Sequence, residues 1–228
     1  MKTLIITPTY NEAENIEKFA KSVLSKGHSL LVVDDNSPDG TYEIVRQLMN
    51  NYNNLYLILR KSKLGLGSAY REGFKWALEN NFDYIVEMDA DFSHRIKDLD
   101  VLLDKKGKST LVIGSRYISG GQTSGWSLYR KLISISANKF SKFISQSKIN
   151  DMTSGFRIYS SDALVKSQSL HSKMNGYAFQ IEMVILCINS NIKVIEVPIH
   201  FVERQKGKSK MDLKISLEAF RYLITIRF

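Results

Sequence analysis

Three carboxylates alternate along the stretch EMDADFSH, residues 87–94, directly after the apolar run 82–86. In a β-strand, Glu87, Asp89 and Asp91 would point the same way, about 6.6 Å apart. Two charges at that distance repel by roughly 2.5 kcal/mol at an effective dielectric near 20, so the cluster needs compensation. Asp-x-Asp offers the oxygen ligands that Mg²⁺ or Mn²⁺ prefers, often shared with substrate phosphates. Protonation, or solvated acids facing Lys or Arg, are the alternatives.

Two other predicted strands also end in polar groups. Asp34-Asp35 follows the second strand, and the segment 8–12, PTYNE, follows the first. In open parallel sheets, ligands bind beyond the carboxyl ends of the strands. Each group has a structural alternative, because Asn11 could cap the next helix and Asp34 or Asp35 could serve the turn at 36–40. Three such ends together favour a ligand site at this edge.

Other candidate motifs fail on spacing or context. In GLGSAYREG, from Gly65, the third glycine of a dinucleotide fingerprint is replaced by Tyr70, and the spacing is not that of a Walker loop. The four histidines show no zinc-ligand spacing, and no G-x-S-x-G elbow is present. Cys187, the single cysteine, lies in an apolar helical stretch, so no intrachain disulfide can form and the thiol is not a predicted nucleophile.

Strands and helices alternate through the first half of the chain. Strands are predicted at 3–10, 29–35, 54–60, 82–89 and 109–117, and helices at 11–27, 42–52 and 68–81, with a further helical stretch before the fifth strand. Thr41 is predicted to cap the second helix. Nearly continuous Val, Ile and Leu in the strands indicates an α/β fold with a mostly parallel sheet that helices cover on both faces.

The second half continues the pattern after a flexible loop. A long helix is predicted at 126–144, with Leu128, Leu132, Ile135, Phe140 and Ile144 on its buried side; strands are predicted at 155–161 and 192–204, with a helix at 177–191 between them. The segment 212–228 forms an amphipathic helix that either packs on the core or lies at a membrane surface. No linker or repeat divides the 228 residues, which indicates one domain.

The chain is basic, with 32 Lys and Arg against 23 Asp and Glu, a formal charge of +9. Such a charge suits nucleic acid, nucleotide phosphates or an acidic lipid surface, and does not choose among them. The N-terminal sequence does not predict a signal peptide, and no apolar run approaches the ~20 residues of a membrane span.

A series of motifs resembles the dolichyl-phosphate mannose synthases. PTYNE, VVDDNSPDGT, LGLGSAYREGF, MDADFSH, GSRY, DMTSGFR, GYAFQIEM, EVPIHFVER and GKSK follow one another in that family's order, across nearly the whole chain. The resemblance implies an inverting polyprenyl-phosphate glycosyltransferase with the GT-A (nucleotide-diphospho-sugar transferase) fold. It divides the single domain 1–228 into a nucleotide-sugar half, 1–118, an acceptor half, 119–210, and the C-terminal helix, 211–228.

The resemblance also assigns residues. Pro8, Tyr10 and Glu12 would line the nucleotide pocket, and Asp35, with Asp34, would contact the base or ribose. Asp89 and Asp91 would bind the Mg²⁺ or Mn²⁺ that bridges the nucleotide diphosphate, and Ser93, which stands where some relatives have Gln, belongs to this predicted metal site. A proline usual after SH in the family is absent, since Arg95-Ile96 follows.

Four residues would bind the acceptor phosphate by the same resemblance: Arg116, Arg130, Ser134 and Arg204. Arginine binds phosphate oxygens with paired donors. A phosphomonoester is largely dianionic at neutral pH, so it needs orientation rather than deprotonation. Asp151 is then expected to partner an arginine rather than to act as a base, and Glu87 is expected beside a buried Arg or Lys. The segment 204–210 is predicted to be a loop that closes over phosphates, with a disordered basic loop as the alternative.

The resulting hypothesis is metal-dependent, inverting transfer of a hexose, mannose from GDP-mannose, onto dolichyl or polyprenyl phosphate. It implies a cytoplasmic chain, peripherally associated with the cytosolic face of a membrane, with a membrane-anchoring partner subunit as a possible addition. The first alternative is the same reaction with UDP-glucose or another nucleotide sugar. The second is a non-catalytic basic nucleotide- or membrane-binding module; a nucleic-acid partner is not expected, because aromatic and basic residues do not interleave.

Overall fold

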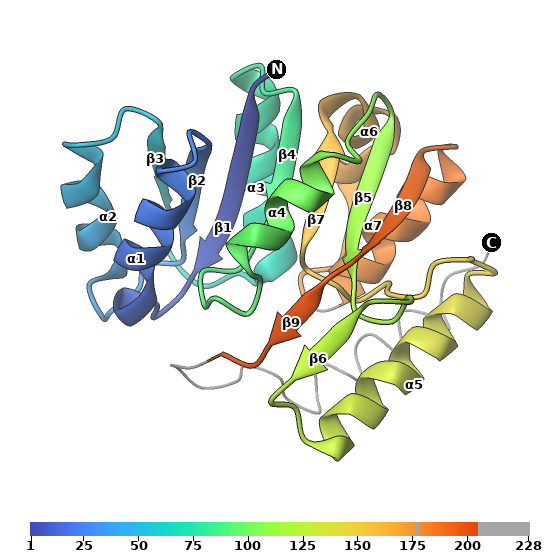
Figure 1. Cartoon of the computed structure of the whole chain (residues 1–228). Helices are drawn as coiled ribbons and strands as arrows, with labels where there is room; N and C mark the ends of the chain where they lie inside the picture. The colour runs from blue at the N-terminus through green and yellow to red at the C-terminus, as the bar shows by residue number, and fades with distance from the viewer. Residues whose placement is uncertain (177, 205–228) are drawn as a thin grey trace.

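A computed structural model describes residues 1–176 and 178–204 of the chain. Its main element is a seven-stranded sheet in the order β3-β2-β1-β4-β7-β5-β8 (Figure 1). The strands are β1 Thr3–Thr9, β2 Ser29–Asp34, β3 Leu55–Leu59, β4 Tyr84–Glu87, β5 Thr110–Ser115, β7 Arg157–Ser160 and β8 Lys193–Pro198. All neighbouring strands run parallel except β7, which is antiparallel to both β4 and β5. The sequence predicted the strand but not its direction.

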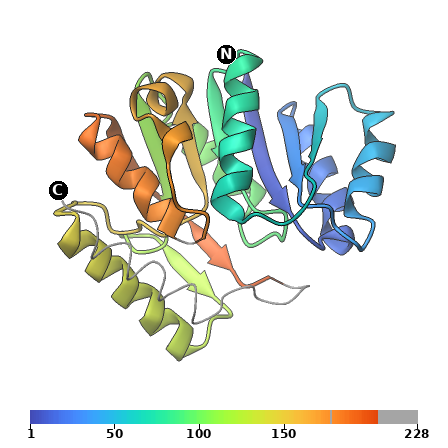
Figure 2. The same ribbon diagram turned by 180° about the vertical axis from the view of Figure 1, so that it is seen from behind.

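Helices cover both faces of this sheet. They are α1 Ala13–Leu24, α2 Thr41–Met49, α3 Leu66–Glu79, α4 Ile96–Leu103, α5 Leu128–Ile144, α6 Ser161–Lys166 and α7 Ala178–Asn189, with a 3₁₀ turn at Ser169–His171. α1, α2 and α4 pack on one face, and α3, α6 and α7 on the other (Figures 1 and 2). Along β1, Leu4 and Ile6 enter one core and Ile5 enters the other, as the two-residue period of a strand requires. The predicted α/β fold with helices on both faces is confirmed.

Some predicted boundaries were wrong. The predicted strand 192–204 breaks after Pro198, and its second part, β9 His200–Val202, leaves the main sheet and pairs in parallel with β6 Gln122–Ser124. α6 and the 3₁₀ turn were not predicted. Thr41 is the first residue of α2 and not its cap: its hydroxyl donates to Asp39 at 2.6 Å and accepts from the Glu12 backbone N–H at 3.0 Å.

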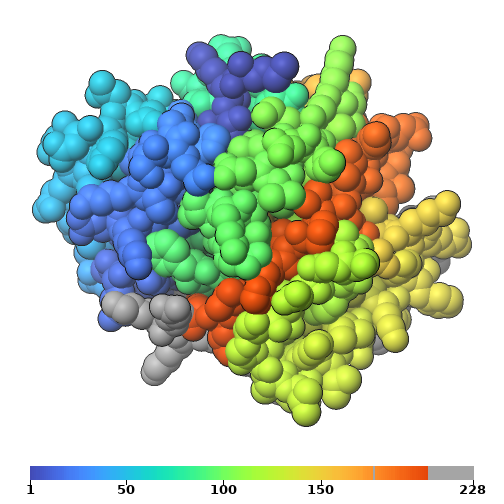
Figure 3. All heavy atoms as spheres, in the orientation of Figure 1, coloured from blue at the N-terminus to red at the C-terminus, as the bar shows by residue number. Residues whose placement is uncertain are grey.

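The buried side of α5 differs most from the prediction. Leu128 and Leu132 are 81% and 64% exposed, and Figure 3 shows α5 on the surface at lower right. The buried positions are instead polar: Ser134, Asn138 and Ser141. Asn138 explains this arrangement, because its amide accepts from the Met152 backbone N–H and donates to the Thr153 hydroxyl. The helix therefore supplies the hydrogen bonds that the buried loop beside it requires.

The main strands end beside the small β6–β9 sheet and α5 (Figure 1). β4 ends at Glu87, two residues before Asp89 and four before Asp91, and β5 ends at Ser115, immediately before Arg116. α5 brings Arg130 and Ser134, and β9 is followed by Arg204. The topology thus brings the predicted metal residues and the predicted phosphate residues to the same end of the sheet.

Candidate active site

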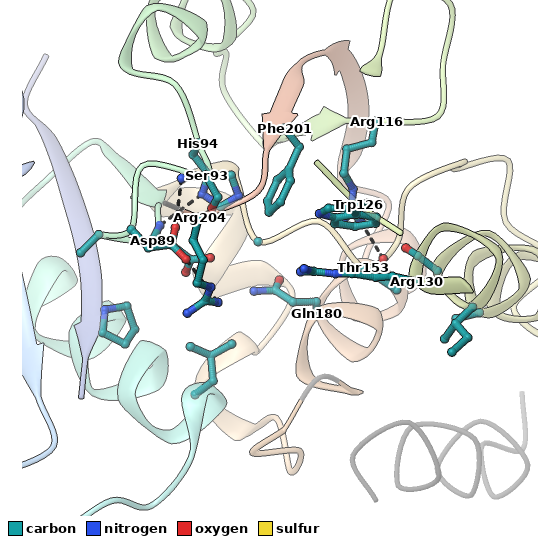
Figure 4. Close-up of a pocket in the computed structure, with 18 of the residues that line it drawn as sticks. Asp89, Ser93, His94, Arg116, Trp126, Arg130, Thr153, Gln180, Phe201 and Arg204 are labelled. Atoms are coloured by element: carbon teal, nitrogen blue, oxygen red, sulfur yellow. Dashed lines mark hydrogen bonds and ion pairs between the residues drawn. The ribbon is translucent and has the colours of Figure 1, made fainter. Parts of the chain in front are cut away.

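A cavity of about 240 Å³ opens at this end of the sheet (Figure 4). Its walls come from both halves of the chain and combine carboxylates, arginines and apolar surface. The polar and charged lining residues are Glu12, Asp89, Asp91, Ser93, His94, Arg116, Arg130, Ser134, Thr153, Gln180 and Arg204. Pro8, Leu66, Ala90, Trp126, Ile133, Ala137, Gly155, Ile181 and Phe201 complete the wall. Of the predicted site residues, Pro8, Glu12, Asp89, Asp91, Ser93, Arg116, Arg130, Ser134 and Arg204 therefore line one cavity.

The loop after β4 presents its carboxylates through local hydrogen bonds. Asp91 is buried, and its Oδ1 accepts from the Ser93 backbone N–H at 3.0 Å. Its Oδ2 forms an ion pair with Nη2 of Arg204 at 3.2 Å. The Ser93 hydroxyl is buried beside these groups and has no hydrogen-bond partner among the described residues. A basic side chain thus balances Asp91, one of the compensations that the sequence left open.

His94 fixes the backbone of this loop, a role that the sequence did not reveal. Its Nδ1 accepts from the Asp89 backbone N–H at 3.2 Å, and its ring stacks on Phe156 with centroids 4.9 Å apart. Burial lowers the pKa of His94 to about 4. The imidazole is therefore neutral at physiological pH, which leaves Nδ1 able to accept that bond.

The donor set suits a hard divalent cation shared with a substrate. No group of three or more His, Cys, Asp or Glu side chains gathers into a metal site among the described residues. A cation of the Mg²⁺ type commonly uses only one or two carboxylates and takes further oxygens from substrate phosphates. Asp89, Asp91 and the hydroxyl of Ser93, which has no partner in the described part of the chain, carry oxygens of that type at the cavity wall and are the groups that could hold such a cation.

Arg116 is held by a buried carboxylate. Asp151 accepts from the Arg116 backbone N–H at 2.9 Å and from Nε and Nη2 at 2.7 Å each. Burial alone would raise the pKa of Asp151, but the adjoining guanidinium lowers it below its ordinary value. The prediction that Asp151 partners an arginine is confirmed, because its carboxylate is engaged in this pair.

Arg130 lies across the same cavity on α5. Its Nη1 forms an ion pair with Oε1 of Glu203 at 2.9 Å, and its guanidinium lies over the Trp126 ring at 4.4 Å from the centroid. Ser134, one turn further along the helix, accepts a hydrogen bond from the Tyr117 hydroxyl at 2.7 Å. Trp126 and Glu203, the residue that follows β9, thus hold an arginine at the cavity, where Figure 4 labels it.

The family model described as Glycosyl transferase family 2 matches residues 4–167. The chain belongs to that family. It is 41% identical over 216 residues to a polyprenol monophosphomannose synthase of Mycolicibacterium smegmatis, covering 92% of this chain and 81% of the relative. It is 38% identical over 225 residues to an undecaprenyl-phosphate mannosyltransferase of Micrococcus luteus, covering 96% and 91%. The resemblance seen in the motifs is confirmed, and the protein is a glycosyltransferase.

Solved structures agree on the fold of this glycosyltransferase. The mannosyltransferase PcManGT from Pyrobaculum calidifontis, in complex with GDP-Man and Mn2+, superposes with a TM-score of 0.62 at 17% identity. S. aureus TarS 1-349, in complex with UDP, superposes with a TM-score of 0.60 at 19% identity. The matches cover 91% and 98% of this chain, and 58% and 64% of the two larger chains. At such identities the likeness shows the fold alone, which is GT-A.

Three of the glycosyltransferase's predicted nucleotide residues lie outside the lining of this cavity: Tyr10, Asp34 and Asp35. Asp34 is fully buried and accepts from the hydroxyls of Thr9 and Ser37 at 2.6 and 2.7 Å. Its carboxylate thus serves the turn after β2, the structural alternative that the sequence left open. The nucleotide-contact prediction for the Asp34 side chain is not supported by this geometry.

Asp35 and Tyr10 each contact a basic residue. Asp35 pairs with Arg60 at 2.9 Å, and burial raises the pKa of Asp35 despite that guanidinium. Lys63 lies over the Tyr10 ring at 4.5 Å from its centroid. A nucleotide role for either residue stays a prediction.

Glu87 lies behind the cavity, in the sheet. β7 places Arg157 opposite it in register, and Gln180 donates to its Oε2 at 2.8 Å. Arg157 is fully buried as expected of a partner for Glu87, but its guanidinium donates to the backbone oxygens of residues 152, 154 and 180. Burial raises the pKa of Glu87 to about 7, although Arg157 opposes that rise. Cys187 is buried with its pKa raised to about 12, so its thiol is inert at physiological pH.

Proposed function

We propose that the chain transfers a mannosyl group from GDP-mannose to the phosphate of a polyprenyl or dolichyl phosphate, with inversion at the anomeric carbon. This proposal rests on the observation that Asp89 and Asp91 line the same cavity as Arg116, Arg130 and Arg204. A leaving diphosphate and an incoming phosphate are both anionic, and this cavity offers separate groups for each. Two relatives, at 41% and 38% identity, carry names that specify transfer to polyprenyl phosphates.

The sugar donor is proposed to bind in the half formed by residues 1–118. Asp89, Asp91 and Ser93 would hold a divalent cation, Mg²⁺ or Mn²⁺, and when bound it would neutralise charge on the leaving diphosphate. His94 supports this group by fixing the Asp89 backbone. Pro8 and Glu12 line the adjoining wall of the cavity and are proposed nucleotide contacts.

The acceptor phosphate is proposed to bind in the half formed by residues 119–210, with Arg116 at its border. Arg116, Arg130, Arg204 and the Ser134 hydroxyl line the cavity and can orient phosphate oxygens. A largely dianionic phosphate can attack C1 without a general base. Two contacts support this proposal, because Asp151 is paired with Arg116 and His94 accepts from the backbone of Asp89.

A membrane surface is the proposed location, because the acceptor is a lipid. No helix in the described part of the chain is long and apolar enough to cross a bilayer. α5 nevertheless exposes large apolar side chains beside the cavity: Leu128, Tyr129, Leu132 and Phe143. Exposed apolar surface of this kind supports peripheral association with lipid. The cytosolic face and a membrane-anchoring partner stay predictions. The predicted amphipathic helix 212–228 lies outside the described residues, as does the predicted loop 204–210 except for Arg204.

A transfer assay tests the proposal. The chain is incubated with a short-chain polyprenyl phosphate and a panel of nucleotide sugars that includes GDP-mannose and UDP-glucose, with Mg²⁺, with Mn²⁺ or with EDTA. We expect transfer from GDP-mannose that requires the cation. Transfer from UDP-glucose instead would replace the sugar donor and keep the reaction, and no transfer from any sugar donor would refute the proposed function.

Two variants separate the halves of the site. Asp91→Asn should lower kcat at least 100-fold by weakening cation binding, whereas Arg130→Ala should raise the KM for polyprenyl phosphate and leave nucleotide binding within twofold. Asp100→Asn is the matched control, because Asp100 lies in α4 and pairs with Lys26 at the surface, outside the cavity. Full activity of Asp91→Asn would contradict the metal role.

A further inference from the structure

Gln180 carries a hydrogen-bond acceptor that the machinery described above does not use. It is the third residue of α7, it lines the cavity, and it is only 2% exposed. Its Nε2 donates to Oε2 of Glu87 at 2.8 Å. Its Oε1 is buried and has no hydrogen-bond partner among the described residues. Figure 4 shows the side chain among the groups that line the cavity.

Glu87 determines which end of this amide remains available. Its carboxylate is fully buried on β4, which lies between β1 and β7, and it stands opposite Arg157 of β7. Oε2 of Glu87 accepts from the NH₂ group of Gln180, so the carbonyl oxygen is the end of the amide that has no hydrogen-bond partner among the described residues. The backbone of Gln180 is also fixed, because its carbonyl accepts from Nη1 of Arg157 at 2.7 Å. A buried acceptor held in one orientation without a partner is unusual, since nearly all buried polar groups are paired.

The chemistry of a carbonyl oxygen selects its ligand. It accepts a hydrogen bond, so it suits a hydroxyl group, and it repels the unprotonated oxygens of phosphates at neutral pH. The carboxylates of the cavity suit a cation on the leaving diphosphate, and its arginines suit the acceptor phosphate. The transferred sugar, which lies between these two groups, carries the hydroxyl groups. We propose that Oε1 of Gln180 accepts a hydrogen bond from a hydroxyl of the transferred hexose and contributes to the choice of sugar, with Glu87 as its positioning residue. This inference rests on the proposed transfer from a nucleotide sugar.

The experiment compares Gln180→Met with the wild-type chain. Methionine keeps the length and helix propensity of glutamine but has no carbonyl oxygen. Calorimetry in Mn²⁺ measures the affinity for GDP, for GDP-mannose and for the set of GDP-mannose analogues that each lack one sugar hydroxyl. We expect Gln180→Met to weaken GDP-mannose about 3- to 10-fold, the size of one neutral hydrogen bond, and to leave GDP within twofold.

The deoxy analogues make the test specific. In the wild type, the GDP-mannose analogue that lacks the partner hydroxyl should bind more weakly than GDP-mannose. In Gln180→Met, that analogue and GDP-mannose should bind with the same affinity. Glu87→Gln should reduce the penalty for that same hydroxyl, because its amide no longer fixes Gln180 in one orientation. Met183→Leu, a core substitution on the same helix and outside the cavity, is the control and should preserve every penalty. Thermal unfolding shows that each variant is folded.

Three outcomes overturn the inference. Equal weakening of GDP and GDP-mannose would indicate a nucleotide or structural role, and weaker binding of Mn²⁺ itself would indicate that the amide oxygen is a metal ligand. Unchanged penalties for every hydroxyl in Gln180→Met would show that Gln180 contacts no sugar hydroxyl. The transfer assay distinguishes this result from a failure of the proposed function. If the proposed function fails, the wild type transfers no hexose to polyprenyl phosphate; if only this inference fails, wild-type transfer is intact.

Discussion

Replacing Asp151 by alanine should destabilise the chain through the charge that it leaves behind. Asp151 is fully buried and accepts three hydrogen bonds from Arg116, and Arg116 is itself 8% exposed. Removing one partner of such a pair strands the other charge in the interior, which costs about 3–5 kcal/mol. For a chain of this size each kcal/mol lowers Tm by roughly 2–4 °C, so Tm should fall by about 6–20 °C.

The matched control is an exposed ion pair. Glu17 pairs with Lys21 at 2.6 Å on α1, with both side chains more than half exposed, and Glu17→Ala should therefore leave Tm almost unchanged. Thermal unfolding followed by circular dichroism at neutral pH compares the two variants, with Asp151→Asn as a variant of nearly unchanged shape. If Asp151→Ala lowers Tm no more than Glu17→Ala does, the buried pair does not stabilise this site as argued.

Two further predictions concern charge at the site. Burial raises the pKa of Glu87 from its ordinary 4.5 to about 7, so between those pH values the folded chain retains a proton that the unfolded chain has lost. Glu87 therefore lowers the free energy of unfolding by on the order of 3 kcal/mol as pH rises through this window. Urea unfolding should show the free energy of unfolding of Glu87→Gln rising relative to that of the wild type from pH 5 to pH 8. A difference between the two that does not change with pH would contradict this. Glu203→Gln removes the carboxylate that pairs with Arg130, which leaves the guanidinium for the acceptor phosphate. The KM for polyprenyl phosphate should therefore fall by at most about fivefold, the size of a partly exposed ion pair. A higher KM in steady-state kinetics would contradict this prediction.

The sequence predicted features that depend on local pattern. The order of strands and helices follows from runs of apolar residues and turn signals, and the placement of Asp89 and Asp91 follows from the end of a strand. Because parallel strands end at one edge, the shared location of these carboxylates and Arg116 was also predictable. The direction of β7 was not, because strand composition carries little information on whether neighbours run parallel or antiparallel.

The features that the sequence missed depend on distant partners. α5 was expected to bury Leu128 and Leu132, but the loop near Thr153 requires hydrogen bonds, and Asn138 meets that need from a different side of the helix. Gln180 is 93 residues from Glu87 in the chain, and its amide is oriented only once β4 and α7 are packed. Periodicity assigns a face to each helix but cannot specify which buried polar group will find a partner.

Burial divides the arginines of the site into two kinds that the sequence treated as equivalent. Arg116 is paired with a fully buried carboxylate, and exchanging that partner for a substrate phosphate would leave Asp151 charged in the interior. Arg130 and Arg204 are paired with Glu203 and Asp91, at 2.9 and 3.2 Å, through one pair of adjacent residues, 203 and 204. Both guanidiniums are more accessible to solvent than that of Arg116, but only Glu203 is a partly exposed carboxylate, so an exchange of partner costs least at Arg130. Arg116 is accordingly expected to keep its carboxylate as a fixed positive charge in the cavity wall, and Arg130 is the arginine that we expect to exchange a carboxylate for a phosphate most readily.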